Sequence, residues 1–162
     1  MKTKLTAIGA VVLFLLIPVL VVYGAKGMGI KTDSELLNTD LSRAEKVWSV
    51  DTHGGFHGDG ISCTAYKYSD GEFLSEIKQN PYWRELPMTE SLNKIITGGL
   101  FRDRGENILP EVANGYYFFL DRQSEGDEAH DDSELWKRYS KNFTLAIYDT
   151  DTDTLYFAEY DS

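Results

Sequence analysis

The sequence predicts an α+β domain with a mostly antiparallel sheet of about five strands and two short helices, preceded by one N-terminal transmembrane helix. Three observations predict it: an uncharged N-terminal segment, strand pairs joined by short turns near both ends of the remaining chain, and two helical patterns between them. The expected order is β-β-α-α-β-β-β. Strands that follow one another through short turns pair antiparallel, which favours α+β over a parallel α/β fold.

The N-terminal segment, residues 5–23, reads LTAIGAVVLFLLIPVLVVY and carries no charge. A helix of this length reaches roughly 28 Å, about the hydrocarbon thickness of a bilayer, whereas the apolar core of a signal peptide has about 7–15 residues. Cleavage after Gly24 or Ala25 would lack a good small-x-small pattern. We therefore expect residues 1–25 to be a membrane anchor in contact with the lipid bilayer through residues 5–23, with a signal segment as the alternative.

The expected location is the cell membrane, in a single pass, with the C-terminal domain extracytoplasmic. Lys2 and Lys4 on one side are matched by Lys26 and Lys31 on the other, so the balance of basic residues barely decides the orientation. A short tail inside and a large domain outside is the usual arrangement. Residues 26–40 are polar and glycine-containing and are expected to form a tether, and residues 41–162 an acidic globular extracytoplasmic domain.

The charge balance excludes one class of partner. The chain has 16 Lys and Arg against 26 Asp and Glu, and without Lys2 and Lys4 the balance is 14 against 26, or −12. Nucleic-acid binding needs a basic stripe that neutralises phosphates, so no nucleic acid is expected as a partner. The 42% of apolar residues exclude a disordered chain.

The first strand pair is expected at residues 46–52 and 61–68. Cys63, the single cysteine, cannot form an internal disulfide and lies on the apolar side of the second strand. Free cysteines are often buried, and no basic neighbour is evident that would lower the pKa of this one. The sequence favours a packing role for Cys63 over a catalytic thiol.

Two helices are expected next, both on one face of the sheet. The first would begin with a capping box from Ser69 to Glu72 and end at Asn80-Pro81. The second would begin after the N-cap Thr89 and end at Gly98-Gly99.

The remaining chain is expected to hold three strands and two loops. Residues 115–120 form a continuous apolar run, typical of a strand covered on both faces. Residues 143–148 and 155–160 flank a polar turn and predict a final hairpin. Residues 100–114 have no clear period and residues 121–135 hold seven acids, so both are expected to be loops, the second one solvated.

The stretch DTHGGFHGDG at residues 51–60 has the most unusual composition in the chain. Taken by itself, the stretch favours a structural hairpin loop, and the first alternative is a loop that binds a ligand or a protein partner. The contacting residues would be Asp51, His53, Gly54, Gly55, His57 and Asp59. The alternative is a metal site of His53, His57, Asp51 and Asp59, since zinc accepts such nitrogen and oxygen ligands and activates water.

Two other ligands are disfavoured. The glycines of this loop are not followed by Lys-Ser/Thr and lead into a strand, so a phosphate cradle is not predicted. Asp149, Asp151 and Asp153 resemble the first half of a calcium loop, but Thr154 stands where that loop needs glycine, which favours a polar turn. No cofactor is expected.

The loop GGFHGDG between two strands, in a short chain with one N-terminal hydrophobic segment, resembles a group of small uncharacterised membrane-anchored proteins of Gram-positive bacteria. The likeness covers roughly residues 47–68 and the later Tyr/Phe-rich strand. It implies a bacterial envelope location and no particular activity.

The function that these features favour is a non-catalytic interaction module with a protein partner that the sequence does not identify. One alternative is a metal-dependent hydrolase that uses the 51–60 loop. The other is an acidic immunity or inhibitor protein, which would mask a basic partner electrostatically.

Overall fold

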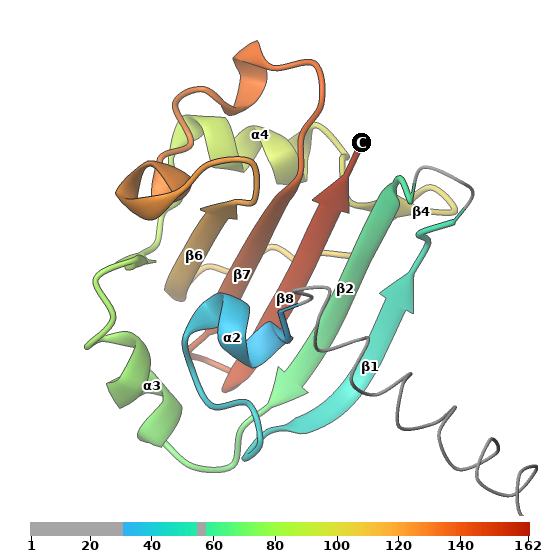
Figure 1. Cartoon of the computed structure of the whole chain (residues 1–162). Coiled ribbons are helices and arrows are strands. Elements are labelled where there is room, and N and C mark those ends of the chain that lie inside the picture. Colours follow the sequence, from blue (N-terminus) through green and yellow to red (C-terminus); the bar gives the residue numbers. More distant parts are fainter. Residues whose placement is uncertain (1–30, 55–57) are drawn as a thin grey trace, which may run out of the picture. The chain divides into compact units, whose positions relative to one another are not determined.

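The computed structural model describes residues 31–54 and 58–162, of which Asp33–Ser162 form one compact unit. Its main element is a six-stranded antiparallel sheet in the order β1-β2-β8-β7-β6-β3 (Figure 1). The strands are β1 (Glu45–Asp51), β2 (Gly60–Lys67), β3 (Trp83–Glu85), β6 (Gly115–Asp121), β7 (Phe143–Asp149) and β8 (Thr154–Asp161). The α+β class and the antiparallel sheet are confirmed, and β3 is the strand of this sheet that the sequence did not predict.

Two hairpins supply four of the six strands. In the turn between β7 and β8, the carboxylate of Asp149 accepts hydrogen bonds from the Asp151 amide and the Thr152 hydroxyl, both at 2.8 Å. Asp153 completes the turn with a φ of 46°, a left-handed conformation that Asp tolerates better than most residues. β8 then pairs with β2 along its whole length, so the two predicted hairpins join into one sheet.

The sheet is covered on both faces, because β6, β7 and β8 carry buried residues at successive positions. On one face, Phe73 and Ile77 of α3 (Glu72–Ile77) pack in a core with Phe118 of β6. On the other face, Leu92 and Ile95 of α4 (Glu90–Thr97) belong to a second core. The expectation that both helices lie on one face is therefore wrong, since the edge strand β3 lies between them in sequence and the chain passes around the sheet there.

The predicted N-cap of α4 is confirmed, and that of α3 is wrong. Thr89 caps α4 as predicted, its hydroxyl accepting from the Leu92 amide at 3.2 Å, and Gly98 is the C-cap. The capping box at Ser69 is wrong. α3 has Gly71 as its N-cap without a side-chain cap, and it is Asp70 whose carboxylate accepts from the Glu72 amide, at 3.2 Å.

Residues 33–40 belong to the folded unit, although their polar pattern predicted a tether. They contain the helix α2 (Asp33–Leu37), and both Leu37 and Leu41 are buried in the core under α2 and α3. A five-residue helix can pack against the core through one or two apolar side chains. So short a helix does not show a hydrophobic periodicity that could be detected in the sequence. The tether residues 26–30 and the expected anchor, residues 1–25, lie outside the described residues. Among residues 31–54 and 58–162, no helix is long and apolar enough to cross a bilayer.

The two expected loops contain short elements. Residues 100–114 include the two-stranded hairpin of β4 (Arg102–Asp103) and β5 (Glu106–Asn107), flanked by the buried residues Phe101 and Leu109. Residues 121–135 include the 3-10 helix η1 (Gly126–His130) and lead into η2 (Leu135–Lys137). This acidic segment is not fully solvated, because Ala129, Asp132 and Leu135 are buried.

Candidate functional site

The base of the 51–60 loop is closed by hydrogen bonds between Thr52 and Ile61, the residues next to the paired ends of β1 and β2. The Thr52 amide donates to the Ile61 carbonyl at 2.9 Å, and the Thr52 hydroxyl accepts from the Ile61 amide at 3.0 Å. The strand pairing thus extends to the first residue after β1. The loop leaves the sheet at His53.

His53 is held by carboxylates on both sides of its ring. Its Nδ1 lies 2.7 Å from Oδ1 of Asp51, and its Nε2 lies 3.0 Å from Oδ2 of Asp161. The His53 amide also donates to Asp51, at 2.9 Å. A Cβ at Gly60 would lie 2.6 Å from the His53 Cα, so this close approach requires glycine there. An imidazolium donates to both carboxylates at once, and a neutral ring donates to one of them.

The contacts continue from Asp161 to Arg122, the residue after β6. The Arg122 guanidinium donates to Oδ1 of Asp161 and to Oε1 of Glu159, each at 2.8 Å. Glu159 and Asp161 lie on one face of β8, where they pair with Ser62 and Gly60 of β2. We call these five residues the His53 network. They are Asp51, His53, Arg122, Glu159 and Asp161.

Burial and hydrogen bonding shift the pKa values of two carboxyl groups of this network in opposite directions. Burial raises the pKa of Glu159, and the nearby Arg122 guanidinium opposes that shift. The pKa of Asp51 is lowered, first by the hydrogen bond from the His53 amide and then by the one from its ring. The network therefore favours ionised Asp51 at the outer end of the chain of contacts and a more easily protonated carboxyl at Glu159. Its direct structural effect is to fix the start of the loop to the last strand.

The structure places the remaining predicted residues of the loop around this base. Gly54 and Asp59 are exposed. Gly55 and His57 lie outside the described residues, so the proposed four-residue metal set is not described as a unit. Within residues 31–54 and 58–162, no three or more His, Cys, Asp or Glu side chains gather closely enough to hold a metal ion. A metal on His53 would have to displace Asp51 or Asp161 from a ring nitrogen.

Two other sequence interpretations are confirmed. Cys63 is fully buried, and desolvation raises the pKa of its thiol to about 12, so it packs rather than reacts as a thiolate. The aspartates of the β7–β8 turn are used within the fold. Asp153 accepts from the Tyr148 hydroxyl at 2.8 Å, and Asp151 accepts from the Asn114 amide at 2.9 Å.

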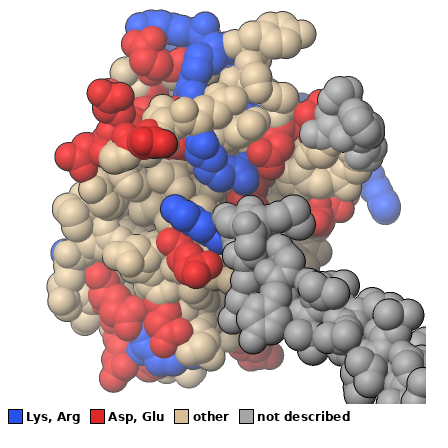
Figure 2. Space-filling model, in the orientation of Figure 1, with Lys and Arg blue, Asp and Glu red and all other residues tan. Residues whose placement is uncertain are grey.

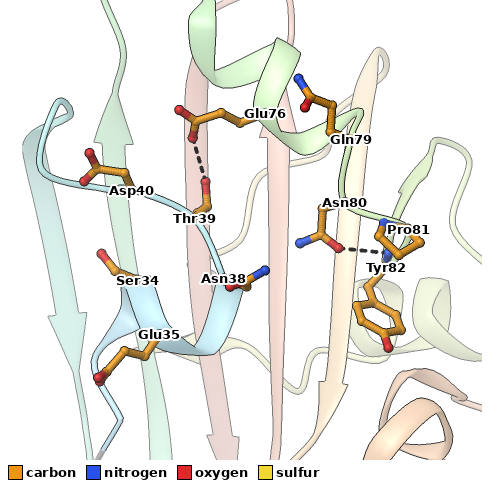
Figure 3. Close-up of a pocket in the computed structure, with 10 residues that line it drawn as sticks. All are labelled: Ser34, Glu35, Asn38, Thr39, Asp40, Glu76, Gln79, Asn80, Pro81 and Tyr82. Carbon is orange, nitrogen blue, oxygen red and sulfur yellow. Dashed lines mark hydrogen bonds between the residues drawn. The ribbon is translucent and has the colours of Figure 1, made fainter.

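A separate pocket of about 700 Å³ lies between α2 and the C-terminal end of α3 (Figure 3). It is lined by Ser34, Glu35, Asn38, Thr39, Asp40, Glu76, Gln79, Asn80, Pro81 and Tyr82. The Thr39 hydroxyl donates to Glu76 at 3.1 Å, and the Asn80 amide donates to the Leu37 carbonyl at 3.3 Å. These bonds join the segment after α2 to α3 and the turn that follows it. We call this feature the α2–α3 pocket.

Sequence reasoning missed Arg122, Glu159 and Asp161, and it missed the α2–α3 pocket. A signal was present for the two acids, because Glu159 and Asp161 continue the face of β8 that carries the buried Phe157. A carboxylate on a face that is otherwise apolar usually has a partner. Nothing in the sequence indicated that the partner of Asp161 would be His53, 108 residues earlier.

We compared the chain with family models, curated proteins and solved structures, and none of the three comparisons gave a match.

Proposed function

We propose that this chain is a membrane-anchored, extracytoplasmic interaction module without catalytic activity, which binds a protein partner through the 51–60 loop. The observation that carries the proposal is the His53 network, because it fixes the base of a glycine-rich loop to the sheet. Loops that recognise partners are commonly presented by a rigid scaffold in this way. Asp59, which precedes Gly60 at the end of the loop, is exposed and available for contact.

The strands that carry the loop are connected through β2 to the central strands of the sheet. β2, which follows the loop, is paired on one side with β1 and on the other with β8. β8 is in turn paired with β7, so the loop base is tied to the centre of the sheet through Asp161. A loop fixed at such a base loses less conformational entropy when its tip binds a partner.

The charge of the folded unit indicates the kind of partner. Residues 33–162 contain 12 Lys and Arg against 26 Asp and Glu, a formal net charge of −14. Figure 2 shows acidic side chains in several groups over one face, with fewer basic ones. A negative field accelerates association with a positively charged protein and makes it sensitive to salt. We therefore propose a basic partner, and an acidic immunity or inhibitor protein is a special case of this function.

The anchor at residues 5–23 remains part of the proposal. Its support is the length of the uncharged segment and the resemblance of the GGFHGDG loop to envelope proteins of Gram-positive bacteria. The metal-dependent hydrolase is the weaker alternative, because both ring nitrogens of His53 already contact carboxylates.

Site-specific photocrosslinking in cells tests the proposal on the full chain. A photoreactive residue replaces Asp59 in one strain and Asn93 in another, since Asn93 is exposed on α4 over the other face of the sheet. We expect a discrete protein adduct from position 59 that weakens in a His53→Ala background. An absent adduct at position 59, or an equally strong one at position 93, would contradict the proposed binding loop.

A further inference from the structure

The α2–α3 pocket has a lining suited to hydroxylated ligands. Its side chains include three amides, from Asn38, Gln79 and Asn80, and the hydroxyls of Ser34 and Thr39. Amides and hydroxyls both donate and accept hydrogen bonds, so they can match a ligand that does the same. In Figure 3 these groups come from two sides of the pocket, Ser34 from α2 with Asn38 and Thr39 just after it, and Gln79 and Asn80 from the turn after α3.

The charged residues that line the pocket are all acidic. Glu35, Asp40 and Glu76 line it, and none of its described lining residues is Lys or Arg. Arg43, which is outside the lining, binds Glu76 and lies near Asp40, so it offsets part of this negative charge. Anionic ligands are therefore disfavoured, and neutral or amine-bearing ones are favoured.

Tyr82 is the aromatic residue among those that line the pocket. Its ring stacks on His130, with centroids 3.6 Å apart and planes inclined by 13°, and its hydroxyl donates to Asp127 at 2.7 Å. His130 is itself fixed, because its Nδ1 lies 2.7 Å from the Phe119 carbonyl and its ring packs edge-on against Phe118. Tyr82 is thus held in place, and it is one of the residues that line the pocket.

We propose that the α2–α3 pocket binds a saccharide that is neutral or carries an amine. A sugar ring presents hydroxyls at its edge and C–H groups on its face. The hydroxyls match the amides and carboxylates of the lining, and the apolar face stacks on the Tyr82 ring. A volume of about 700 Å³ is ample for one or two sugar rings.

This inference does not depend on the function proposed for the 51–60 loop, because the two sites share no residue. Its test uses the full chain in phospholipid nanodiscs, which carry no sugar headgroups. Binding is followed by saturation-transfer NMR with N-acetylglucosamine as the neutral probe, glucosamine as the amine-bearing probe and glucuronic acid as the anionic control. We expect saturable binding of at least one of the first two, and binding of glucuronic acid that is about tenfold weaker or absent.

Matched variants locate the binding. Tyr82→Ala should weaken it about tenfold, whereas Tyr82→Phe keeps the ring and should bind as the wild type does. Tyr139→Ala is the control, because that tyrosine is fully exposed and outside the pocket. Gln79→Ala should weaken binding severalfold and the exposed Asn93→Ala should not.

Two results would overturn the inference. One is the absence of saturable binding by both favoured sugars to a chain whose thermal melt shows that it is folded. The other is sugar binding by Tyr82→Ala and Gln79→Ala that is as strong as binding by the control variants, Tyr139→Ala and Asn93→Ala. The sugar would then bind outside the pocket.

Discussion

Nε2 of His53 lies 3.0 Å from Oδ2 of Asp161, although the two residues are 108 positions apart in the sequence. The contact joins the beginning of the 51–60 loop to the last residue of β8. Because Asp51 holds the other ring nitrogen at 2.7 Å, the imidazole bridges the first and the last strand of the sheet in chain order. This bridge is the feature from which we infer a fixed recognition loop.

Replacing His53 should loosen the loop base without unfolding the domain. In His53→Ala both ring contacts are lost, and we expect the free energy of unfolding to fall by about 1 kcal/mol, since the side chain is partly solvated. Amide exchange should accelerate at Thr52 and Ile61, whose mutual hydrogen bonds close the loop. Hydrogen exchange followed by NMR measures this directly. Asp59→Ala, an exposed change in the same loop, should leave both amides as protected as before.

Asp121 and Arg138 form the most buried ion pair described, with the Asp121 side chain 3% exposed. Although burial raises the pKa of Asp121, hydrogen bonds from Arg138, Ser124 and the Gln123 amide outweigh it and lower that pKa below 3.8. The unfolded chain therefore takes up the proton at higher pH. The stability from this carboxylate is present above about pH 4 and is lost as the pH falls through the folded pKa.

Arg138→Ala should accordingly destabilise the fold by about 2 kcal/mol at neutral pH, because it leaves a buried carboxylate without its partner. The unfolding free energy of this variant should also fall less steeply below pH 4 than that of the wild type, because its Asp121 carboxylate contributes less stability at neutral pH. Denaturant unfolding at a series of pH values measures both effects. The control is Lys137→Ala, whose pair with Glu134 is exposed and should contribute at most about 0.5 kcal/mol. Equal effects of the two variants would refute this account of the pair.

His130 should make stability depend on pH near neutrality. Its pKa is lowered chiefly by burial and also by Arg84, while the Phe119 carbonyl and Asp127 oppose that shift. The unfolded histidine takes a proton near pH 6.5, above the folded one, so the stability it contributes is present above that value and is lost as the pH falls further. Between about pH 7 and pH 5 the wild type should lose more unfolding free energy than His130→Gln. Urea denaturation at pH 7 and at pH 5 measures this difference. Equal losses of unfolding free energy in the wild type and in His130→Gln would contradict the role assigned to His130.

Leu37 tests whether residues 33–40 are part of the fold. The side chain is fully buried in the core beneath α2 and α3, so Leu37→Ala should cost about 2–4 kcal/mol and lower the melting temperature by several degrees. Val47→Ala removes an aliphatic side chain that is 49% exposed and should change stability by less than about 0.5 kcal/mol. If residues 33–40 were only a tether, the two variants would melt alike.

Local signals predicted much of the sheet. The polar residues 149–153 between two apolar runs identified the last hairpin, and Thr89 identified the start of α4, because turns and caps depend on residues that are close in the sequence. β3 was missed because a strand of three residues has no period to detect. It lies at the edge of the sheet and between α3 and α4 in the chain, and these helices pack in the cores of opposite faces.

Only those residues of the candidate site that lie in the 51–60 loop were predicted from the sequence. The composition of residues 51–60 indicated that Asp51 and His53 were unusual, but their partner Asp161 could be found only from the register of β2 with β8. That register pairs Gly60 with Asp161, and it is set by the packing of the whole sheet rather than by any local pattern. The α2–α3 pocket was unpredictable for the same reason, since Asn38 and Gln79 line one pocket only after both helices have packed.

We infer that the His53 network presents a loop that a basic protein binds. The most direct test takes the partner recovered from the Asp59 adduct and measures its association with the full chain in nanodiscs by surface plasmon resonance. We predict that rising salt slows association and that His53→Ala increases the dissociation rate about tenfold. Rate constants that neither salt nor His53→Ala changes would contradict the claim.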